Sequence, residues 1–286
     1  MILDIKTLAD TLTQEVRENV KQLKQKPHLT IVMVGNNNAS EVYVRNKLKM
    51  CENVGIGSQL LHLEESISEE ELLKNIKQLN QDENVTGILV QSPLPKQINA
   101  QTIFDTIDAK KDVDGFSTTN IARLYSGDES WLIPGTPKGI MYIIEHYFQT
   151  KGNEKIEGKH AVVIGKSTIV GKPLAMLLLH AGATVTVCHS RTQELSEHTK
   201  QADIVISAVG KKHLITADMI QPGSLVIDVG INVETNDTGK KLFGDCDTGN
   251  IGRIADVTPV PGGVGPMTIA MLLSNVLRAH EIQGKQ

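Results

Sequence analysis

The sequence predicts an α/β protein of two domains, the second built on a Rossmann-type parallel sheet. Three observations support this fold class. Short apolar runs alternate with segments whose apolar residues recur at helical spacing, which is typical of βαβ units. A polar stretch with two glycines, KGNEKIEGK at residues 151–159, separates two such series. The length of 286 residues is enough for two domains of ordinary size.

The first series contains four expected helices, the last of them near residues 99–108, and three expected strands. Apolar residues at helical spacing predict a helix over residues 8–23. Ser40 is the expected N-cap of a second helix, and Ser68 with Glu71 forms a capping-box signature at the start of a third. The expected strands are LTIVMVG (29–35), LLHL (60–63) and TGILVQ (86–91).

The second series begins with a helix over residues 136–150, in which Pro137 suits the first turn. A strand, a glycine turn and a helix then follow in VVIGKSTIVGKPLAMLLLHAG (162–182). The last helix has a one-sided apolar stripe, at positions 269, 272, 273, 276 and 277. Further strand signals recur at 183–188, 203–209 and 224–230.

Composition excludes several classes of function. The net charge is −4 and no basic run stands out, so we expect no nucleic-acid partner. No apolar stretch reaches the ~18 residues of a membrane helix, and the first residues do not resemble a signal peptide. The three cysteines are widely spaced, which indicates reduced thiols in a cytoplasm. No Cys and His cluster has zinc-ligand spacing, so we expect no metal there.

The glycine turn of the second series predicts a dinucleotide site. Gly165 lets the chain leave the strand sharply, and Gly171 begins a helix whose free N–H groups suit a phosphate. Ser167 stands in place of the second glycine of a G-x-G-x-x-G pattern, and the last glycine comes one residue late. The alternative is a strand-to-helix turn that binds no ligand.

The end of the next strand indicates which dinucleotide is bound. NAD sites usually carry a carboxylate there for the ribose hydroxyls. This chain instead has Ser190 and Arg191, a hydroxyl and a guanidinium that suit a 2′-phosphate, with Lys166 as a further positive charge. We therefore expect NADP as the cofactor. The alternative is that these residues are solvated surface charges.

The first series offers a second candidate site. Ligands of parallel sheets bind at the carboxyl ends of strands. Lys47 follows the first strand, Gln91 ends the third, and Asp114 comes shortly after a helix; Tyr43 lies four residues before Lys47 on the same helix face. The alternative is a half-buried tyrosine with a lysine that extends into solvent. Asp112 and Asp114 together also raise a metal site, but two carboxylates alone are a weak ligand set.

Eight motifs occur in order and carry a family resemblance over the whole chain. They are NASEVYVRNK, VQSPLP, KDVDGF, PGTPKG, GKSTIVGKP, CHSRT, DVGIN and TPVPGGVGPMT. In combination they closely resemble the bifunctional methylenetetrahydrofolate dehydrogenase/methenyltetrahydrofolate cyclohydrolase family. We expect no formyltetrahydrofolate synthetase region, which some relatives carry.

The resemblance implies an architecture. Residues 1–140, with 267–286 returning, would form the folate-binding catalytic domain, and residues 141–266 would form the NADP-binding Rossmann domain. The two domains would flank a cleft, with the C-terminal helix packed back on the first. The resemblance also implies a homodimer, formed through the cofactor domain, in the cytoplasm.

The resemblance also implies residue roles. Lys47 would be the catalytic lysine, Gln91 would tune it, and Asp114 would grip the pterin ring. Tyr43 would stack on the folate, which Pro261, Gly262 and Gly263 would border. The residues expected to hold NADP are Gly165, Lys166, Ser167, Gly171, Ser190, Arg191 and Ile231.

Two other functions remain open from the residues alone. One is another two-domain NADP-dependent dehydrogenase, similar to shikimate dehydrogenase, which would not explain PGGVGPMT beside QSPLP. The other is a non-catalytic NADP-binding sensor, which would have no need of Lys47. Lys166 stands where an arginine is common in the family, so the strictness of NADP over NAD stays open.

Overall fold

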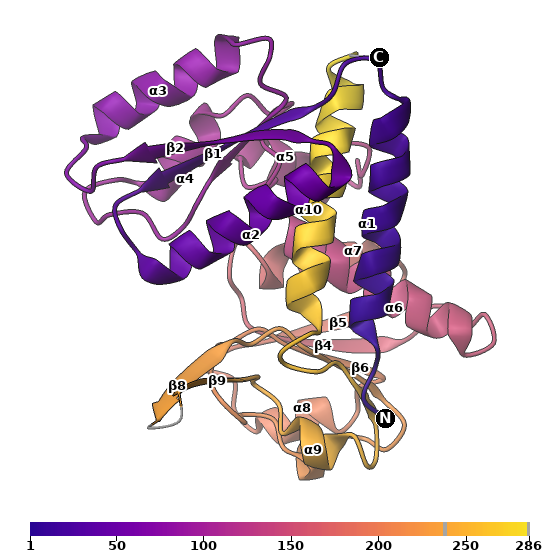
Figure 1. Ribbon diagram of the computed structural model, residues 1–286. Helices are drawn as coiled ribbons and strands as arrows, with labels where there is room; N and C mark the ends of the chain where they lie inside the picture. The colour runs from indigo at the N-terminus through magenta and orange to yellow at the C-terminus, as the bar shows by residue number, and fades with distance from the viewer. Residues whose placement is uncertain (237–238, 285–286) are drawn as a thin grey trace. The chain divides into compact units, whose positions relative to one another are not determined.

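The fold alternates helices with mostly parallel strands, in a computed structural model that describes residues 1–236 and 239–284 (Figure 1). The first half contains α1 (Ile5–Gln22), β1 (His28–Val34), α2 (Asn38–Val54), β2 (Gly57–Leu63), α3 (Glu69–Gln81), β3 (Gly87–Val90), α4 (Ala100–Thr106), α5 (Thr118–Tyr125) and α6 (Gly135–Thr150). The second half contains β4 (His160–Ile164), α7 (Gly171–His180), β5 (Thr184–Cys188), α8 (Leu195–Thr199), β6 (Ile204–Ser207), η1 (Ala217–Met219), β7 (Leu225–Asp228), β8 (Asn232–Asn236), β9 (Gly239–Phe243), α9 (Thr248–Ile251), β10 (Asp256–Val257) and α10 (Val264–Ile282).

The chain forms two compact units, which we name after their main features. The Lys47 unit comprises residues 11–135 and 269–286, and the glycine-turn unit comprises residues 1–10 and 136–268. The two-domain α/β fold expected from the sequence is therefore confirmed. The units differ from the expected domain boundaries chiefly in residues 1–10, which belong to the glycine-turn unit.

The Lys47 unit has a parallel sheet with the strand order β2-β1-β3. Its central strand β1 is apolar on both faces because helices cover both sides. Leu29, Ile31 and Met33 pack into one core cluster, whereas Val32 and Val34 pack into another. This alternation is the period-two geometry of a strand, and it explains why the sequence reads as a continuous apolar run.

Different helices supply the two clusters of this unit. α1, α2 and α10 contribute to the cluster around Leu29, and α3 and α4 contribute to the cluster around Val32. Figure 1 shows α2 and α3 on opposite sides of the sheet. Leu273 and Val276 of α10 are fully buried in the first cluster, so the expected return of the C-terminal helix to this part of the chain is confirmed.

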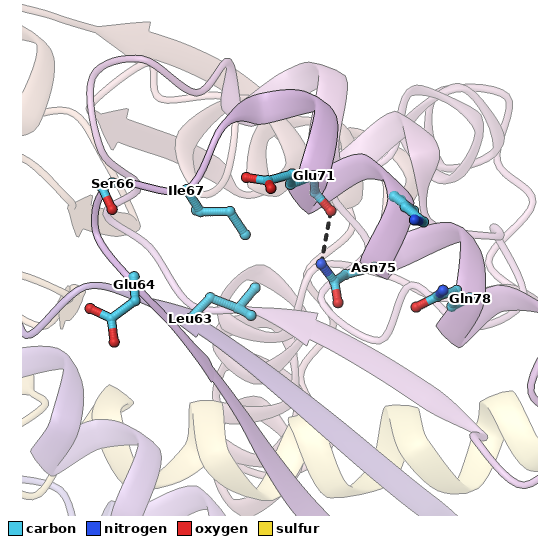
Figure 2. A pocket seen from close by; sticks show the side chains of 8 residues that line it. Leu63, Glu64, Ser66, Ile67, Glu71, Asn75 and Gln78 are labelled. Atoms are coloured by element: carbon cyan, nitrogen blue, oxygen red, sulfur yellow. Dashed lines mark hydrogen bonds between the residues drawn. The ribbon is translucent and has the colours of Figure 1, made fainter.

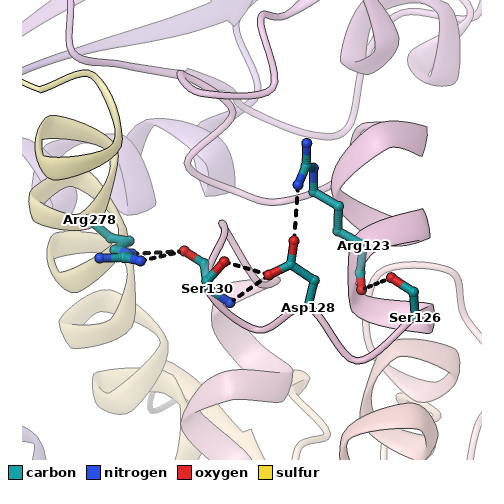
Figure 3. A network of polar contacts seen from close by, with 5 residues as sticks. All are labelled: Arg123, Ser126, Asp128, Ser130 and Arg278. Atoms are coloured by element: carbon teal, nitrogen blue, oxygen red, sulfur yellow. Dashed lines mark hydrogen bonds and ion pairs between the residues drawn. The ribbon is translucent and has the colours of Figure 1, made fainter.

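Polar contacts also attach α10 to this unit. The Arg278 guanidinium donates to the Ser130 carbonyl oxygen at 2.6 and 2.9 Å. Asp128 accepts hydrogen bonds from the Ser130 backbone and hydroxyl, and it pairs with Arg123 of α5 at 3.0 Å (Figure 3). The loop after α5 is thereby held between α5 and the last helix.

The helix starts show one confirmed cap and one correction. At α3, Ser68 Oγ accepts from the Glu71 N–H at 3.2 Å while the Glu71 carboxylate accepts from the Ser68 N–H, so the expected capping box is present. The expectation that Ser40 caps α2 is wrong, because α2 begins at Asn38. The Ser40 N–H instead donates to Asn37 Oδ1 at 3.1 Å. Asn37 directly precedes α2, so its amide oxygen is the acceptor for the first turn.

In the described residues, the glycine-turn unit has a five-stranded parallel sheet in the order β10-β7-β6-β4-β5. The strand order reverses beside β4, which places β4 and β6 at the switch point where Rossmann-type folds bind ligands. α7 packs on β4 and β5, and the face near α8 and α9 carries its own apolar cluster. The antiparallel hairpin of β8 and β9 had no counterpart among the strands expected from the sequence.

Two further findings bear on the class of protein. Cys51, Cys188 and Cys246 are buried and are not joined in disulfides. Within residues 1–236 and 239–284, no helix combines the length and the apolar character that a membrane span needs.

Candidate functional site

Lys47 and Gln91 meet at the carboxyl end of the sheet in the Lys47 unit. Lys47 lies on α2, which follows β1, and Gln91 directly follows β3. The Lys47 Nζ donates to Gln91 Oε1 at 3.0 Å. The Gln91 Nε2 donates to the Ser92 carbonyl oxygen at 2.7 Å, which fixes the amide with its oxygen toward the amine. The lysine therefore has a neutral acceptor as its hydrogen-bond partner.

The surroundings of Lys47 weaken its hold on a proton. Burial lowers the pKa of Lys47, and the charge of Asp114 acts in the opposite direction. Gln91 carries no charge, so it accepts a hydrogen bond without favouring the ammonium form as a carboxylate would. Cys51 is buried nearby, and burial raises the pKa of its thiol to about 12. Lys47 is thus placed to act as an amine base.

Asp114 is electrostatically coupled to this pair. Burial raises the pKa of Asp114 to about 6, Lys47 lowers it, and the neighbouring Asp112 raises it. Asp114 is partly exposed, whereas Asp112 is 1% exposed. The expected grouping of Lys47, Gln91 and Asp114 thus places an amine, an amide and a carboxylate in one region of one unit.

Asp112 is committed to the protein and not to a metal. Its carboxylate accepts from the backbone N–H groups of Gly115, Phe116 and Ser117 at 3.0, 3.3 and 2.8 Å, and from Asn120 Nδ2 at 2.9 Å. In the part of the chain that the structure describes, no group of three or more His, Cys, Asp or Glu side chains could hold a metal ion. The two aspartates of KDVDG therefore have separate tasks, since Asp112 shapes the turn that presents Asp114.

Gly115 and Asn275 hold this turn in place, and sequence reasoning missed the second of them. Gly115 has a φ of +69°, and a Cβ there would lie 2.7 Å from the Pro134 nitrogen, so only glycine fits. Asn275 of α10 is fully buried, and its Nδ2 donates to the carbonyl oxygens of Val113 and Ile133 at 2.9 and 2.7 Å. The sequence signal for this contact was Asn275 itself, a polar residue within the apolar stretch of the last helix.

Tyr43 lies one helical turn before Lys47 on α2 and is 44% exposed. An aromatic side chain with this degree of solvent exposure can stack on a flat ligand. A surface hollow of about 500 Å³ lies elsewhere in this unit, between the end of β2 and α3, where it is lined by residues such as Glu64, Glu71 and Asn75 (Figure 2). None of the expected site residues lines it, so it is not the candidate site.

The glycine turn between β4 and α7 has no room for a side chain at Gly165 or Gly171. Gly165 has a φ of +121°, and a Cβ there would collide with the Ala208 carbonyl oxygen. A Cβ at Gly171 would collide with the Gly165 carbonyl oxygen. Ser167 Oγ accepts from the N–H groups of Val170 and Gly171 at 3.2 and 3.3 Å, so the serine in place of a glycine supports the turn. Because Gly165 and Gly171 carry no side chains, a ligand can come close to the backbone N–H groups at the start of α7.

The turn after β5 presents the residues expected at the 2′-phosphate. The His189 Nδ1 accepts from the Arg191 N–H at 3.1 Å, and the Thr192 N–H donates to the His189 carbonyl oxygen at 2.8 Å. Ser190 and Arg191 are exposed, as is Lys166. Among residues 1–236 and 239–284, no group of the protein forms a hydrogen bond or ion pair with the Arg191 guanidinium, so it is available to an anion.

The remaining expected residues also belong to the glycine-turn unit. Ile231 follows β7 and is 48% exposed. Pro261, Gly262 and Gly263 lie in the segment between β10 and α10. Gly262 has a φ of +96°, and a Cβ at Gly263 would collide with the Pro259 carbonyl oxygen.

Comparisons with known proteins agree with both halves of this description. The catalytic-domain model of tetrahydrofolate dehydrogenase/cyclohydrolase matches residues 3–114, and the NAD(P)-binding-domain model of the same family matches residues 134–284. The bifunctional protein FolD of Staphylococcus haemolyticus is 46% identical over 286 residues, with 99% of this chain and 97% of that protein covered.

Solved structures give the same result. The bifunctional FolD dehydrogenase/cyclohydrolase of Campylobacter jejuni is 44% identical, with a TM-score of 0.93 and 99% of each chain covered. The Trypanosoma brucei dehydrogenase-cyclohydrolase, solved in complex with NADP and an inhibitor, is 31% identical with a TM-score of 0.92, covering 100% of this chain and 99% of that one.

Proposed function

The chain belongs to the tetrahydrofolate dehydrogenase/cyclohydrolase family, and from that premise we propose how its residues divide the two reactions. The protein oxidises 5,10-methylenetetrahydrofolate to 5,10-methenyltetrahydrofolate with NADP⁺, then hydrolyses that product to 10-formyltetrahydrofolate. The alternatives of a shikimate-dehydrogenase-like enzyme and of a non-catalytic sensor are not favoured, because both matched domains are of this one family.

The observation that carries the assignment of the hydrolytic step is the 3.0 Å hydrogen bond from Lys47 Nζ to Gln91 Oε1. In that step water adds to the cationic methenyl carbon and loses a proton as the C–O bond forms. The hydroxyl then loses its proton to form the formyl C=O as the bond from that carbon to N5 breaks; N5 takes up one proton, so one proton is released overall. Lys47 is the group that accepts and passes protons, since burial and the cationic substrate both favour its neutral form.

Gln91 and Asp114 support that role in different ways. Gln91 orients the amine through its fixed amide oxygen and adds no charge that would keep the amine protonated. Asp114 accepts hydrogen bonds from the N–H donors of the pterin, because a carboxylate offers only acceptors. Tyr43 stacks on the folate, and Pro261, Gly262 and Gly263 border it.

The residues of the glycine-turn unit fit NADP. Gly165 and Gly171 leave room for the pyrophosphate at the start of α7, with Ser167 supporting the turn. Ser190, Arg191 and Lys166 are exposed for the 2′-phosphate, and Ile231 contacts the cofactor. When bound, NADP⁺ supplies the acceptor for the hydride of the methylene bridge. The protein contributes alignment of two flat rings to this step, more than acid or base.

The domain roles and the assembly are part of the same proposal. Residues 1–140 with 267–286 hold the folate, and residues 141–266 hold NADP. Two copies associate through the cofactor domain, where β5 is an edge strand with Val187 40% exposed. The three unpaired cysteines support a cytoplasmic location. Sedimentation of the purified protein tests the dimer.

The test of the function is a pair of assays on the purified protein. Methylenetetrahydrofolate is mixed with NADP⁺ or NAD⁺, and both the formation and the decay of the methenyl product are followed by absorbance. Lys47→Met is expected to bind NADP⁺ as the wild type does and to lose cyclohydrolase turnover. Hydrolysis at the wild-type rate in that variant would exclude Lys47 as the base.

A further inference from the structure

The Asp245 side chain accepts several hydrogen bonds from the loop that follows β6. It is fully buried, and its carboxylate accepts from Ser207 Oγ at 3.0 Å. It also accepts from the backbone N–H groups of Val209, Gly210 and Lys211 at 2.8, 3.2 and 2.8 Å. Four donors from residues 207–211 therefore converge on one side chain, 34 to 38 residues away in sequence.

The same carboxylate reaches the loop that follows β7. Asn232 Nδ2 donates to Asp245 Oδ1 at 3.3 Å, and a Cβ on Gly230 would collide with the Asp245 carboxylate. The neighbouring Asp228 completes the junction, because it accepts from the N–H groups of Gly230, Asp245 and Cys246 at 2.9 to 3.0 Å. Asp245 thus connects the two loops at the carboxyl ends of adjacent strands.

These loops carry the surface that faces a dinucleotide at the switch point. Val209 and Ile231 follow β6 and β7, and they are 46% and 48% exposed. The Ala208 carbonyl oxygen also lies against Gly165, so the position of the β6 loop limits the glycine turn. We propose that Asp245 is a positioning residue for the cofactor, which holds both loops where NADP meets them. This inference rests on the proposed NADP site.

The charge of Asp245 matters as well as its shape. All of its partners named above are donors, so an acceptor-only group is required at this position. Asparagine has nearly the same shape, but its NH₂ group would face donors and leave some of them without an acceptor. Asp245→Asn is therefore expected to loosen the loops without creating a cavity.

The experiment compares two activities of the same chain. Asp245→Asn is expected to raise the KM for NADP⁺ at least tenfold in the dehydrogenase assay. The rate of methenyltetrahydrofolate hydrolysis, measured without NADP⁺, is expected to stay within twofold of wild type. The matched control is Asp203→Asn at the amino end of the same sheet, where the carboxylate accepts from the His160 N–H at 2.8 Å. That control should leave the KM for NADP⁺ unchanged.

Each outcome bears on the proposal. An unchanged KM for NADP⁺ in Asp245→Asn overturns it, and so does an equal rise in both variants, which would indicate general loosening of the sheet. If Asp245→Asn does not fold, Ser207→Ala removes a single donor, and a KM rise of about threefold or more is expected for it; no rise overturns the proposal. A wild-type protein that does not use NADP⁺ would instead refute the proposed function, independently of both variants.

Discussion

Gln91→Glu tests whether Lys47 acts as a neutral amine. The substitution puts a carboxylate where a neutral amide oxygen now accepts from Lys47 Nζ at 3.0 Å. Glutamate has the length of glutamine, so the geometry is preserved while a negative charge is added. That charge favours the ammonium form and raises the pKa of Lys47, which opposes the effect of burial.

The size of the effect follows from the distance. Two unit charges 3.0 Å apart attract by about 5.5 kcal/mol at an effective dielectric constant of about 20. Desolvation of the new carboxylate offsets part of this, and an opposite charge so close typically shifts a pKa by about 1 to 3 units. Each unit lowers the neutral fraction of the amine about tenfold while the pH is below the pKa. Hydrolysis at neutral pH is therefore expected to fall about 10- to 1,000-fold.

The assay is the decay of methenyltetrahydrofolate over a range of pH. In Gln91→Glu the rate is expected to recover at higher pH. The rising limb of its pH–rate profile should move to higher pH by as many pH units as the pKa of Lys47 rises. Gln91→Met is the control, since it removes the acceptor without adding a charge and is not expected to displace the limb upward. A Gln91→Glu enzyme with the wild-type rate and the wild-type pH limb would refute the role of a neutral Lys47.

Three further predictions concern cofactor choice, pH and stability. Ser190→Asp with Arg191→Ala should move the preference from NADP⁺ toward NAD⁺ in the ratio of kcat/KM values, and unchanged NADP⁺ affinity would place the 2′-phosphate elsewhere. Burial raises the pKa of Asp114 to about 6, so the contribution of Asp114 to the free energy of unfolding should fall as pH rises from about 4, the unfolded value, to about 6. Asp114→Asn should remove this loss, and urea unfolding should show the variant more stable above about pH 6 but equal below about pH 4; a constant difference would contradict the coupling. The buried Lys111 Nζ donates to the carbonyl oxygens of Leu79, Asn80 and Asp82 at the end of α3. Lys111→Met should therefore lower the free energy of unfolding in urea by about 2 to 4 kcal/mol. A decrease below about 1 kcal/mol would contradict a stabilising role of these hydrogen bonds.

The sequence by itself determined the features that depend on local geometry. Apolar residues at period two and at helical spacing predicted the strands and helices of both units, because those periods follow from the covalent chain. The Ser68–Glu71 capping box and the turn at Gly165 were also predictable, since each depends on only a few neighbouring residues. Motif order then indicated the family, and strand ends indicated Lys47 and Gln91.

Only the tertiary structure determined which polar groups, distant in sequence, form hydrogen bonds or interact electrostatically with one another. Asp112 and Asp114 are two residues apart and alike in sequence, yet one accepts backbone hydrogen bonds and the other is coupled to Lys47. Asn275 reaches Val113 across 162 residues, and Asp245 reaches Ser207 across 38. No local pattern encodes these contacts, because a buried polar group takes whichever partners the packed chain brings within hydrogen-bond distance.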